Sequence, residues 1–427
     1  MRIDKFKVKE LMNKRQISTQ TELAKLIGIT KNQLSVILSP KFDPFKSNIT
    51  RLCEVLGVTP MEILEQELQA NTIIKENVES YGLKRTGLKV LELFAGAGGL
   101  ALGMEMAGLH TEALIEIDKS ASQTLKHNRP HWNVINDDVR NIDFSNFNVD
   151  IVTGGFPCQA FSYAGKKLGF EDTRGTLFFE FARAIKQIRP KLFIAENVRG
   201  IISHDNGRTL KTIIDILGEL GYKVQYKLVN AVNYGIPQKR ERVIICGTLE
   251  GTGLNFTFPK EEKGIVTLKE ALKDVPKSEG MQYSANRKRI LDLVPPGGCW
   301  RDLPLEIQKE FMGKSFYSGG GRTGMARRLS WDEPSLTLTT SPSQKQTERC
   351  HPSETRPFTV REYARIQTFP DSWEFVGSLS DKYKQIGNAV PVKLAHKIGQ
   401  SIVEAFQNQD MQSQSVQNDV LQLVLEI

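Results

Sequence analysis

The sequence LELFAGAGGL at residues 91–100 decides the fold of the larger part of this chain. An apolar, strand-like segment at residues 89–93 runs into a glycine-rich turn, and an apolar helical pattern follows at residues 100–107. Glycine permits backbone angles that other residues avoid, so a ligand can approach such a turn closely. The glycine spacing is not the G-x-G-x-x-G of dinucleotide enzymes. The turn therefore indicates an adenosyl ligand without a pyrophosphate, such as S-adenosylmethionine.

Strand and helix patterns alternate after this turn, which is typical of a parallel α/β sheet. We expect strands at residues 89–93, 113–117, 149–152, 192–195, 223–229 and 243–246, and helices at residues 100–107, 121–128, 177–188 and 209–220. Glu116 lies at the end of the second strand, where a carboxylate can bind ribose hydroxyls. Asp138 follows a possible third strand, where its carboxylate can accept a hydrogen bond from an adenine amino group.

A cysteine stands in a rigid turn at residues 152–162, with the sequence VTGGFPCQAFS. Two glycines allow unusual backbone angles, and Pro157 restricts both its own backbone and that of Phe156. The thiol of Cys158 is therefore expected to have a defined direction, as a reactive cysteine needs. A plain strand-to-loop turn is the alternative that this segment alone leaves open.

Composition describes a soluble protein with an ordinary core: 427 residues, 40% hydrophobic and 25% charged. No apolar run is long enough for a membrane span, and the polar start lacks a signal peptide, so we expect a cytoplasmic protein. The five cysteines are scattered without a Cys-x-x-Cys pair, which favours neither disulfides nor a metal site. Lys and Arg exceed Asp and Glu by 57 to 49, and residues 280–330 hold nine basic against four acidic side chains. That excess favours a polyanionic partner.

Residues 1–70 have the pattern of a small helical domain. A helix at residues 21–27 ends at Gly28, and Thr30 caps a second helix that begins with polar side chains. This arrangement resembles the helix-turn-helix of Cro-like and phage-repressor-like regulators, which implies that Lys31, Asn32, Gln33 and Ser35 enter a DNA major groove. Two more helices are expected at residues 48–56 and 60–68. A helical docking domain without DNA contact is the alternative.

We expect four further segments after this domain. Residues 71–87 are a polar linker, residues 88–248 hold the catalytic sheet, residues 249–355 form a loop-rich lobe, and residues 356–406 return to the catalytic domain. A final helix is expected at residues 392–406, and the glutamine-rich tail at residues 407–427 is expected to be frayed.

Six motifs occur in order along the chain: FAGAGG at 94–99, GFPCQ at 155–159, ENV at 196–198, QKRER at 238–242, RPFTVREYARIQTFPD at 356–371 and GNAVP at 387–391. Taken together they resemble the bacterial DNA (cytosine-5)-methyltransferases of type II restriction–modification systems. Singly, Glu196 can be read as half of a strand-end salt bridge and the arginines of 238–242 as a solvated charge run. The resemblance implies a Rossmann-like methyltransferase sheet with a target-recognition lobe, preceded here by an all-α helix-turn-helix domain.

The resemblance also implies catalytic roles. Cys158 adds to C6 of cytosine, Glu196 acts at N3, and Arg242 holds O2 with Arg240 beside it. The target base is flipped out of duplex DNA, and the basic lobe holds the duplex. That lobe includes Arg287, Lys288, Arg289, Arg322, Arg327 and Arg328, and the segment WDEPSLTLTT at residues 331–340 resembles its core.

The cofactor contacts implied by the motifs are Phe94, Gly96, Gly98, Glu116, Asp138, Pro157 and Asn388. The match around Asp138 departs from the family, because Asp137 stands where glycine is usual. Duplex DNA and S-adenosylmethionine are the implied partners, together with a paired restriction endonuclease and operator DNA for the N-terminal domain. The implied target is GGNCC or GGWCC. A transcriptional regulator with a secondary methyltransferase domain, and an RNA methyltransferase, are the alternatives.

Overall fold

The computed structural model describes residues 8, 11, 12, 17, 19–37, 86–157, 177–317 and 324–425, with the backbone alone beyond residue 411. Cys158 and the helices expected at 48–56 and 60–68 lie outside these residues. The chain divides into two compact units, Met1–Gly82 and Leu83–Ile427.

Two helices of the first unit follow the expected pattern. Helix α2 (Gln20–Ile27) begins at Thr19, whose hydroxyl accepts a hydrogen bond from the backbone N–H of Glu22. It ends at Gly28, which has a φ of 80° and donates its N–H to the helix, so the expected glycine stop is confirmed. Helix α3 (Lys31–Ile37) follows at once. Thr30 and Gln33 cap it reciprocally: the Thr30 Oγ1 accepts from Gln33 N, and the Gln33 Oε1 accepts from Thr30 N.

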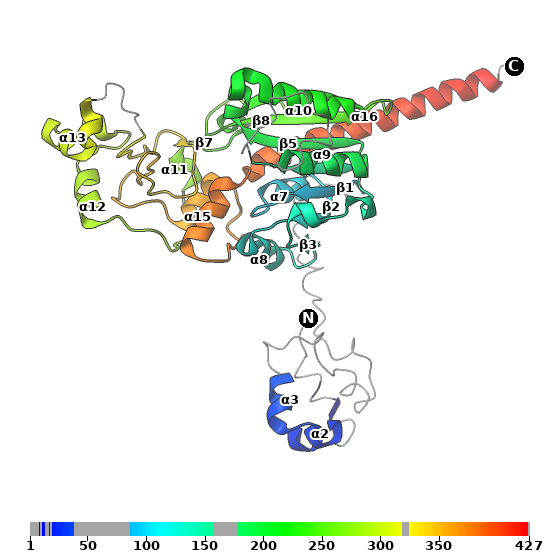
Figure 1. The fold of residues 1–427 in the computed structure, drawn as a ribbon, viewed down its shortest axis with the longest axis horizontal. Coiled ribbons are helices and arrows are strands. Elements are labelled where there is room, and N and C mark those ends of the chain that lie inside the picture. Colours follow the sequence, from blue (N-terminus) through cyan, green and yellow to red (C-terminus); the bar gives the residue numbers. More distant parts are fainter. Residues whose placement is uncertain are drawn as a thin grey trace. The chain divides into compact units, whose positions relative to one another are not determined.

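The second unit is built on a seven-stranded sheet (Figure 1). Its strand order is β3-β2-β1-β4-β5-β8-β6. The strands are β1 (Lys89–Leu93), β2 (His110–Ile115), β3 (Val134–Ile135), β4 (Ile151–Gly154), β5 (Leu192–Val198), β6 (Tyr222–Asn230) and β8 (Glu241–Leu249). The five strands from β3 to β5 run parallel, as the alternating pattern predicts.

Strand β8 breaks the expected parallel arrangement, because it is antiparallel to both of its neighbours, β5 and β6. Strands β6 and β8 are joined by a short segment that holds a 3-10 turn (Ala231–Tyr234) and the two-residue strand β7 (Gln238–Lys239). A parallel crossover needs about a dozen residues or more and usually a helix, so this connection produces a hairpin instead. The expected parallel sheet is therefore confirmed from β3 to β5, and β8 is the exception.

Helices cover both faces of the sheet. Helices α9 (Leu177–Ile188) and α10 (Arg208–Glu219) pack on the face that receives Leu91 and Leu93 of β1. Helices α7 (Gly99–Met106) and α16 (Val392–Leu425) pack on the opposite face with Val90. This division follows from the alternation of side chains along a strand. Helix α8 (Lys119–Asn128) follows β2. Short 3-10 turns lie at Val139–Asn141, Phe144–Asn146, Arg199–Ile202 and His204–Gly207.

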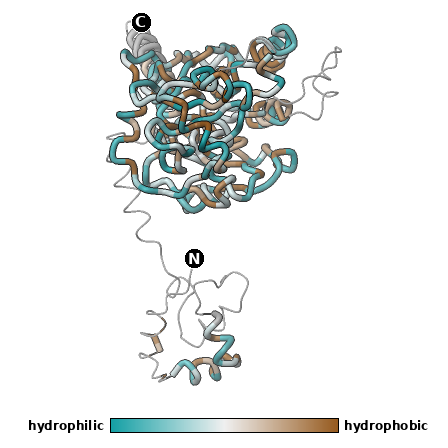
Figure 2. The backbone as a smooth tube through the Cα atoms, turned by 90° about the vertical axis from the view of Figure 1, so that its left-hand side faces the viewer, coloured by the Kyte–Doolittle hydropathy of each residue, from teal (hydrophilic) through white to brown (hydrophobic). Residues whose placement is uncertain are grey.

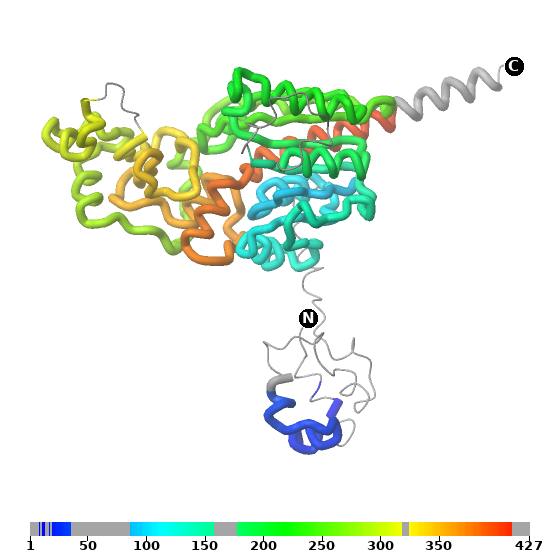
Figure 3. Tube along the Cα trace, viewed as in Figure 1, coloured from blue at the N-terminus to red at the C-terminus, as the bar shows by residue number. Residues whose placement is uncertain are grey.

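The last helix of the second unit packs against a helix near the start of that unit. The first part of helix α16, drawn orange to red in Figure 3, lies along α7 although the two are far apart in sequence. Small residues allow the close approach: a Cβ added at Gly103 would lie 2.3 Å from the Cβ of Ala395. The expectation that residues 407–427 are frayed was wrong as far as Leu425, because α16 continues to that residue. This segment holds neither glycine nor proline, so nothing in it interrupts a helix.

The lobe between β8 and the return carries short helices joined by long loops. These are α11 (Leu268–Ala271), α12 (Ala285–Asp292) and α13 (Leu305–Met312), with 3-10 turns at Trp300–Asp302 and Gly313–Tyr317. The lobe has its own apolar cluster, which includes Leu291, Trp300 and Phe311. Strand β9 (Ser335–Leu336) pairs with β7, and helices α14 (Val360–Ile366) and α15 (Leu379–Asn388) lead to α16. Figure 2 shows hydrophilic loops along the outside of this unit. Among the described helices, none is both long and apolar enough to cross a membrane.

Candidate active site

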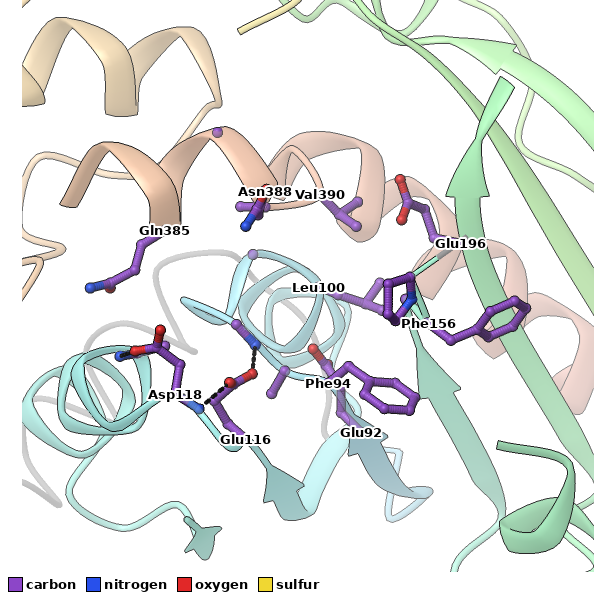
Figure 4. Close-up of a pocket in the computed structure, with 18 of the residues that line it drawn as sticks. Glu92, Phe94, Leu100, Glu116, Asp118, Phe156, Glu196, Gln385, Asn388 and Val390 are labelled. Carbon is purple, nitrogen blue, oxygen red and sulfur yellow. Dashed lines mark hydrogen bonds between the residues drawn. The ribbon is translucent and has the colours of Figure 1, made fainter. Parts of the chain in front are cut away.

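A cavity of about 510 Å³ opens where the carboxyl ends of the parallel strands meet (Figure 4). Its walls come from the turns that follow β1, β2 and β4, from the end of β5, and from residues 384–390 at the end of α15. In doubly wound sheets ligands bind at this edge. Of the residues predicted from sequence, those that line the cavity are Phe94, Gly96, Glu116, Pro157, Glu196, Arg240, Arg242 and Asn388.

The glycine turn brings backbone close to its neighbours. Gly96 and Gly98 have φ values of 54° and 83°, in the region that favours glycine. A Cβ at Gly98 would lie 2.6 Å from the side chain of Leu125, and a Cβ at Gly99 would lie 2.2 Å from the backbone oxygen of Val390. The turn therefore packs directly against the segment that carries Asn388. Gly99 lines the cavity and Gly98 is not among the lining residues.

Glu116 is held by backbone donors at the end of β2. Its Oε2 accepts from Gly96 N at 2.7 Å, and its Oε1 accepts from Asp118 N at 2.7 Å (Figure 4). Burial raises the pKa of this carboxyl, while the two backbone N–H groups act in the opposite direction. The carboxylate keeps further lone pairs for a ligand in the cavity.

Asp118 and Lys384 form a second polar pair at the cavity wall, and the sequence did not single them out. Lys384 Nζ lies 2.8 Å from Asp118 Oδ2, which holds the pKa of Asp118 below its usual value. Asp118 also caps α8 through the N–H groups of Ser120 and Ala121. An acidic residue just before a helix is a signal for such a cap, but its pairing with Lys384 depends on the tertiary fold.

Glu92 is a buried carboxyl group in the wall of the cavity. It is 2% exposed, and its Oε2 has no hydrogen-bond partner among the described residues. Burial raises the pKa of Glu92 well above its ordinary value, and the nearby charge of Glu116 raises it further. An acidic residue inside an apolar strand is the sequence signal that could have found it. The arrangement leaves an acceptor available to a cationic donor.

Glu196 and Arg242 form an ion pair at the other end of the cavity. The Arg242 Nε lies 2.6 Å from Glu196 Oε1, and both side chains are 13% exposed. The pair is brought together by the antiparallel register of β5 and β8, in which Val198 lies opposite Arg242. Gly155 leaves space beside it, because a Cβ there would lie 3.2 Å from Glu196 Oε2. Glu196 therefore forms a salt bridge at the end of its strand and also lines the cavity.

Arg240 is 1% exposed, and its guanidinium group donates hydrogen bonds to backbone carbonyls. Its Nη1 donates to Leu338 O at 3.2 Å, and its Nη2 donates to Gly387 O at 3.0 Å and Ala389 O at 3.1 Å. Burial lowers its pKa to about 9. The two arginines therefore differ: Arg242 pairs with a carboxylate in the cavity, whereas Arg240 binds three backbone carbonyls of two other segments.

The turn that precedes Cys158 is anchored to the strand that carries Glu196. Asn197 is buried, and its Nδ2 donates to the carbonyl of Phe156 at 2.9 Å. Pro157 lines the cavity, and Cys158 follows it in the chain but lies outside the described residues. Asn197 thus fixes the backbone two residues before the cysteine.

Asp138 is not among the residues that line the cavity. It caps the 3-10 turn at Val139–Asn141, and both of its oxygens accept from the Arg140 guanidinium. These bonds lower the pKa of Asp138. Its contact with an adenine group stays a prediction.

Several basic residues of the lobe are paired within it. Arg287 contacts Glu348 at 2.5 Å, Lys288 contacts Asp292 at 2.9 Å, and Arg289 contacts Glu310. Arg328 is buried and donates to the carbonyls of Leu291, Val294 and His351. Arg322 lies outside the described residues. Within the described part of the chain, no group of three or more His, Cys, Asp or Glu is placed to hold a metal ion.

Comparisons with known proteins identify families for both parts of the chain. The family model for C-5 cytosine-specific DNA methylases matches residues 88–404, and the model for Cro/C1-type helix-turn-helix DNA-binding domains matches residues 7–69. The type II methyltransferase M.Sau96I of Staphylococcus aureus is 51% identical over 94% of this chain and 98% of its own length. M.Eco47II of Escherichia coli, also a type II methyltransferase, is 62% identical over 74% of this chain and 78% of its own length.

Solved structures give the same fold. A DNA modification methyltransferase encoded within an Escherichia coli prophage superposes with a TM-score of 0.56 and 25% identity, over 75% of this chain and all of that one. The Dnmt2 protein of Spodoptera frugiperda superposes with a TM-score of 0.54 at 19% identity, over 74% of this chain and 99% of that one, which shows likeness of fold alone.

Proposed function

The chain belongs to the C-5 cytosine-specific DNA methylase family, and from that premise we propose that it methylates C5 of a flipped-out cytosine in a short duplex site. It is a type II cytosine-5 methyltransferase of the restriction–modification type. The observation that carries the proposal is the Glu196–Arg242 pair in the same cavity as the glycine turn and Pro157. An acid, a base-holding cation and the segment before Cys158 then meet at one end of a ligand cavity.

The reacting base needs three groups from the protein. The Cys158 thiolate forms a bond to C6, which places electron density on C5. Glu196 acts at N3 and Arg242 holds O2, so that the negative charge that develops on the ring is balanced in a water-poor site. After C5 has received the methyl group, loss of the C5 proton and elimination of the thiolate restore the aromatic ring. Because C6 is unreachable inside a duplex, the cytosine enters the cavity by flipping.

The cavity also fits S-adenosylmethionine, which supplies the methyl group from its sulfonium centre. Glu116 offers a carboxylate to ribose hydroxyls, and Gly96 allows close approach of the backbone. The unpartnered oxygen of Glu92 suits the ammonium group. Phe94, Pro157 and Asn388 line the same cavity. Gly98 and Asp138 do not line the cavity, and their contacts with the cofactor are further parts of the proposal.

Arg240 has a positioning role in this proposal. Its bonds to Leu338, Gly387 and Ala389 keep the strand of Arg242 in register with the segment of Asn388. Asn197 does the same for the turn before Cys158.

Substitution of the proposed nucleophile tests this function. We expect Cys158→Ala to abolish methyl transfer from labelled S-adenosylmethionine, while duplex binding in a gel-shift assay is retained. Cys246→Ala is the control, because Cys246 is buried in β8 and burial raises its pKa, which keeps the thiol protonated. Methyl transfer by Cys158→Ala at the unsubstituted rate would contradict the mechanism. Competition with RNA separates DNA from RNA as the substrate.

The proposal extends to the target sequence and to a cognate restriction endonuclease. We expect GGNCC or GGWCC sites to be methylated and so protected from a paired restriction enzyme in the cytoplasm. Bisulfite sequencing of DNA from expressing cells would identify the site directly. Methylated cytosines outside these sequences would contradict the assignment.

A second function is favoured by the first unit, since a Cro/C1-type domain model matches it. Helix α3 begins with Lys31, Asn32 and Gln33, all exposed, and its reciprocal cap fixes the turn before it. We propose that this helix binds operator DNA and represses transcription. In the full chain, Lys31→Ala with Asn32→Ala should remove a promoter footprint and leave methylation unchanged. Absence of any footprint with the unsubstituted chain would end the regulator hypothesis.

A further inference from the structure

A buried polar network connects the lobe to both ends of the cavity. Its side chains are Gln238 of β7, Gln367 at the end of α14, and Arg240, each at most 1% exposed. Residues 238, 240 and 242 alternate along extended chain, so they project to one face. The third member of that face is Arg242, which meets Glu196.

The lobe end of the network is the backbone of Leu338. Its N–H donates to Gln238 Oε1 at 2.9 Å, and its carbonyl accepts from Arg240 Nη1 at 3.2 Å. Both polar groups of one lobe residue are therefore bound by side chains of the segment that leads to Arg242. Displacement of this part of the lobe must move these side chains or break their bonds.

The cofactor end of the network is the turn that carries Asn388. Gln238 Nε2 donates to Gln367 Oε1 at 2.7 Å, and Gln367 Nε2 donates to Ile386 O at 2.8 Å and Ala389 O at 3.0 Å. The same turn packs against the lobe, since a Cβ at Gly387 would lie 2.1 Å from Thr339 O. It also packs against the glycine turn through Gly99.

We propose that Gln238 and Gln367 are positioning residues that couple the recognition lobe to the cofactor turn, so that duplex DNA on the lobe raises the cavity's affinity for the adenosyl cofactor. The proposal rests on the cofactor and lobe assignments made above. Every amide group of the network has a partner, so it is rigid, and a shift at Leu338 passes to residues 386–389 by hydrogen bonds alone. Coupling of this kind is reciprocal: the cofactor strengthens DNA binding by the same factor.

The substitution Gln367→Met breaks the glutamine branch of the network and leaves the Arg240 branch, which also joins Leu338 to Gly387 and Ala389. Ile386 O still accepts from Ala389 N at 3.2 Å, and Ala389 O still accepts from Arg240 Nη2, so both carbonyls keep a donor. Only the Gln238 amide loses its partner, and the double variant with Gln238→Met removes that group as well. Gln225→Met is the matched control, because Gln225 of β6 donates its amide N–H to Phe256 O, and neither residue lines the cavity.

The experiment measures binding of S-adenosylhomocysteine by calorimetry, with and without a saturating duplex that carries the site found by bisulfite sequencing. We expect the duplex to raise the affinity of the unsubstituted protein and of Gln225→Met by roughly tenfold, and that of Gln367→Met by only about twofold. The double variant should match Gln367→Met, since both substitutions remove one connection. If Gln367→Met does not fold, Gln238→Met breaks the same bond from its other end and also removes the acceptor of the Leu338 N–H.

Two outcomes overturn the proposal: equal affinity with and without duplex in the unsubstituted protein, or undiminished coupling in the folded variants. Absence of S-adenosylhomocysteine binding under both conditions would instead remove the cofactor assignment, and the coupling proposal with it. A merely structural role would lower the melting temperature of Gln367→Met and leave the ratio of the two affinities unchanged.

Discussion

The two ends of the cavity hold their carboxylates in different ways. At the end beside the glycine turn, Glu116 accepts hydrogen bonds from two backbone N–H groups. At the other end, Glu196 is held by the side chain of Arg242. One carboxylate is fixed by the fold itself, and the other is bound to a group that a ligand can displace.

This difference indicates which end of the cavity is already formed before a ligand binds. Backbone donors at residues 96 and 118 keep their positions with or without a ligand, so the Glu116 end is preorganised. Burial removes water from both charged groups of an ion pair, and their mutual attraction compensates for this loss only when the geometry is good. Each charged group therefore keeps the other as its partner until a substrate takes its place. We infer that the Glu196 end exchanges an internal bond for bonds to the base.

Loss of the acid at the base end should have the largest effect. We expect Glu196→Gln to lower kcat by about 10²–10⁴-fold, because a carboxyl that acts at N3 is replaced by an amide. Affinity for S-adenosylhomocysteine should stay within about twofold, since the other end keeps its backbone donors. Single-turnover methylation and calorimetry measure the two quantities. Glu241→Gln is the control, because Glu241 pairs with the exposed Arg199. An equal loss of kcat in Glu196→Gln and Glu241→Gln would contradict a special role for Glu196.

Crowding of the preorganised end should have the next effect. Gly99→Ala places a Cβ 2.2 Å from Val390 O, so the cofactor turn must move. We expect a loss of about 1–3 kcal/mol in the free energy of unfolding, and roughly tenfold weaker binding of S-adenosylhomocysteine. Gly218→Ala is the matched control in helix α10, where nothing lies within 4 Å of the added atom. Unchanged stability and affinity in Gly99→Ala would show that the turn adapts freely.

A subtler change at the same end is Glu116→Gln. The amide group directs an N–H toward one of the two backbone donors, so we expect about fivefold weaker cofactor binding with kcat at saturating cofactor nearly unchanged. Initial rates at varied S-adenosylmethionine separate the two effects. Asp143→Asn is the control, since Asp143 accepts from a backbone N–H at Ser145, away from the cavity. A fall in kcat alone would place Glu116 at the chemical step instead.

Glu92→Gln should have the smallest effect, and it depends on pH. The unfolded carboxyl ionises near its ordinary pKa, whereas burial keeps the folded Glu92 protonated to higher pH. The folded state then holds the extra proton, so the stability of the unsubstituted protein falls as pH rises above about 4.5, with a limiting slope of about 1.4 kcal/mol per pH unit. Glutamine removes this loss. Urea unfolding at pH 4.5 and 7 should show that Glu92→Gln is more stable than the unsubstituted protein at pH 7 and not at pH 4.5; an equal difference at both pH values would contradict it.

The parts of the fold that follow from local pattern were predictable from sequence. Strand β1 and helix α9 have the expected bounds, because β1 is a short, mostly apolar run and α9 repeats its apolar residues at helical spacing. The cap at Thr30 and the stop at Gly28 follow from local chemistry. The antiparallel course of β8 was missed, since the sequence pattern of a strand does not state its direction.

The candidate site divides in the same way. A glycine turn and a carboxylate at a strand end are local signals, and both Gly96 and Glu116 line the cavity. Lys384 reaches Asp118 from a helix far along the chain, so no local pattern announces the pair. The different surroundings of Arg240 and Arg242 were also hidden, because both belong to one charged run whose burial is decided by the lobe and the cofactor turn.

The packing of α16 against α7 has a consequence for how the protein is made. Helix α7 leaves the ribosome long before the segment that covers it, and contacts between such distant segments form slowly. Until residues 387–398 arrive, the apolar face of α7 is exposed and the cavity lacks the wall that contains Asn388. A nascent or truncated chain therefore cannot hold the cofactor between its two walls, so methylation begins only after the return segment has been synthesised and docked.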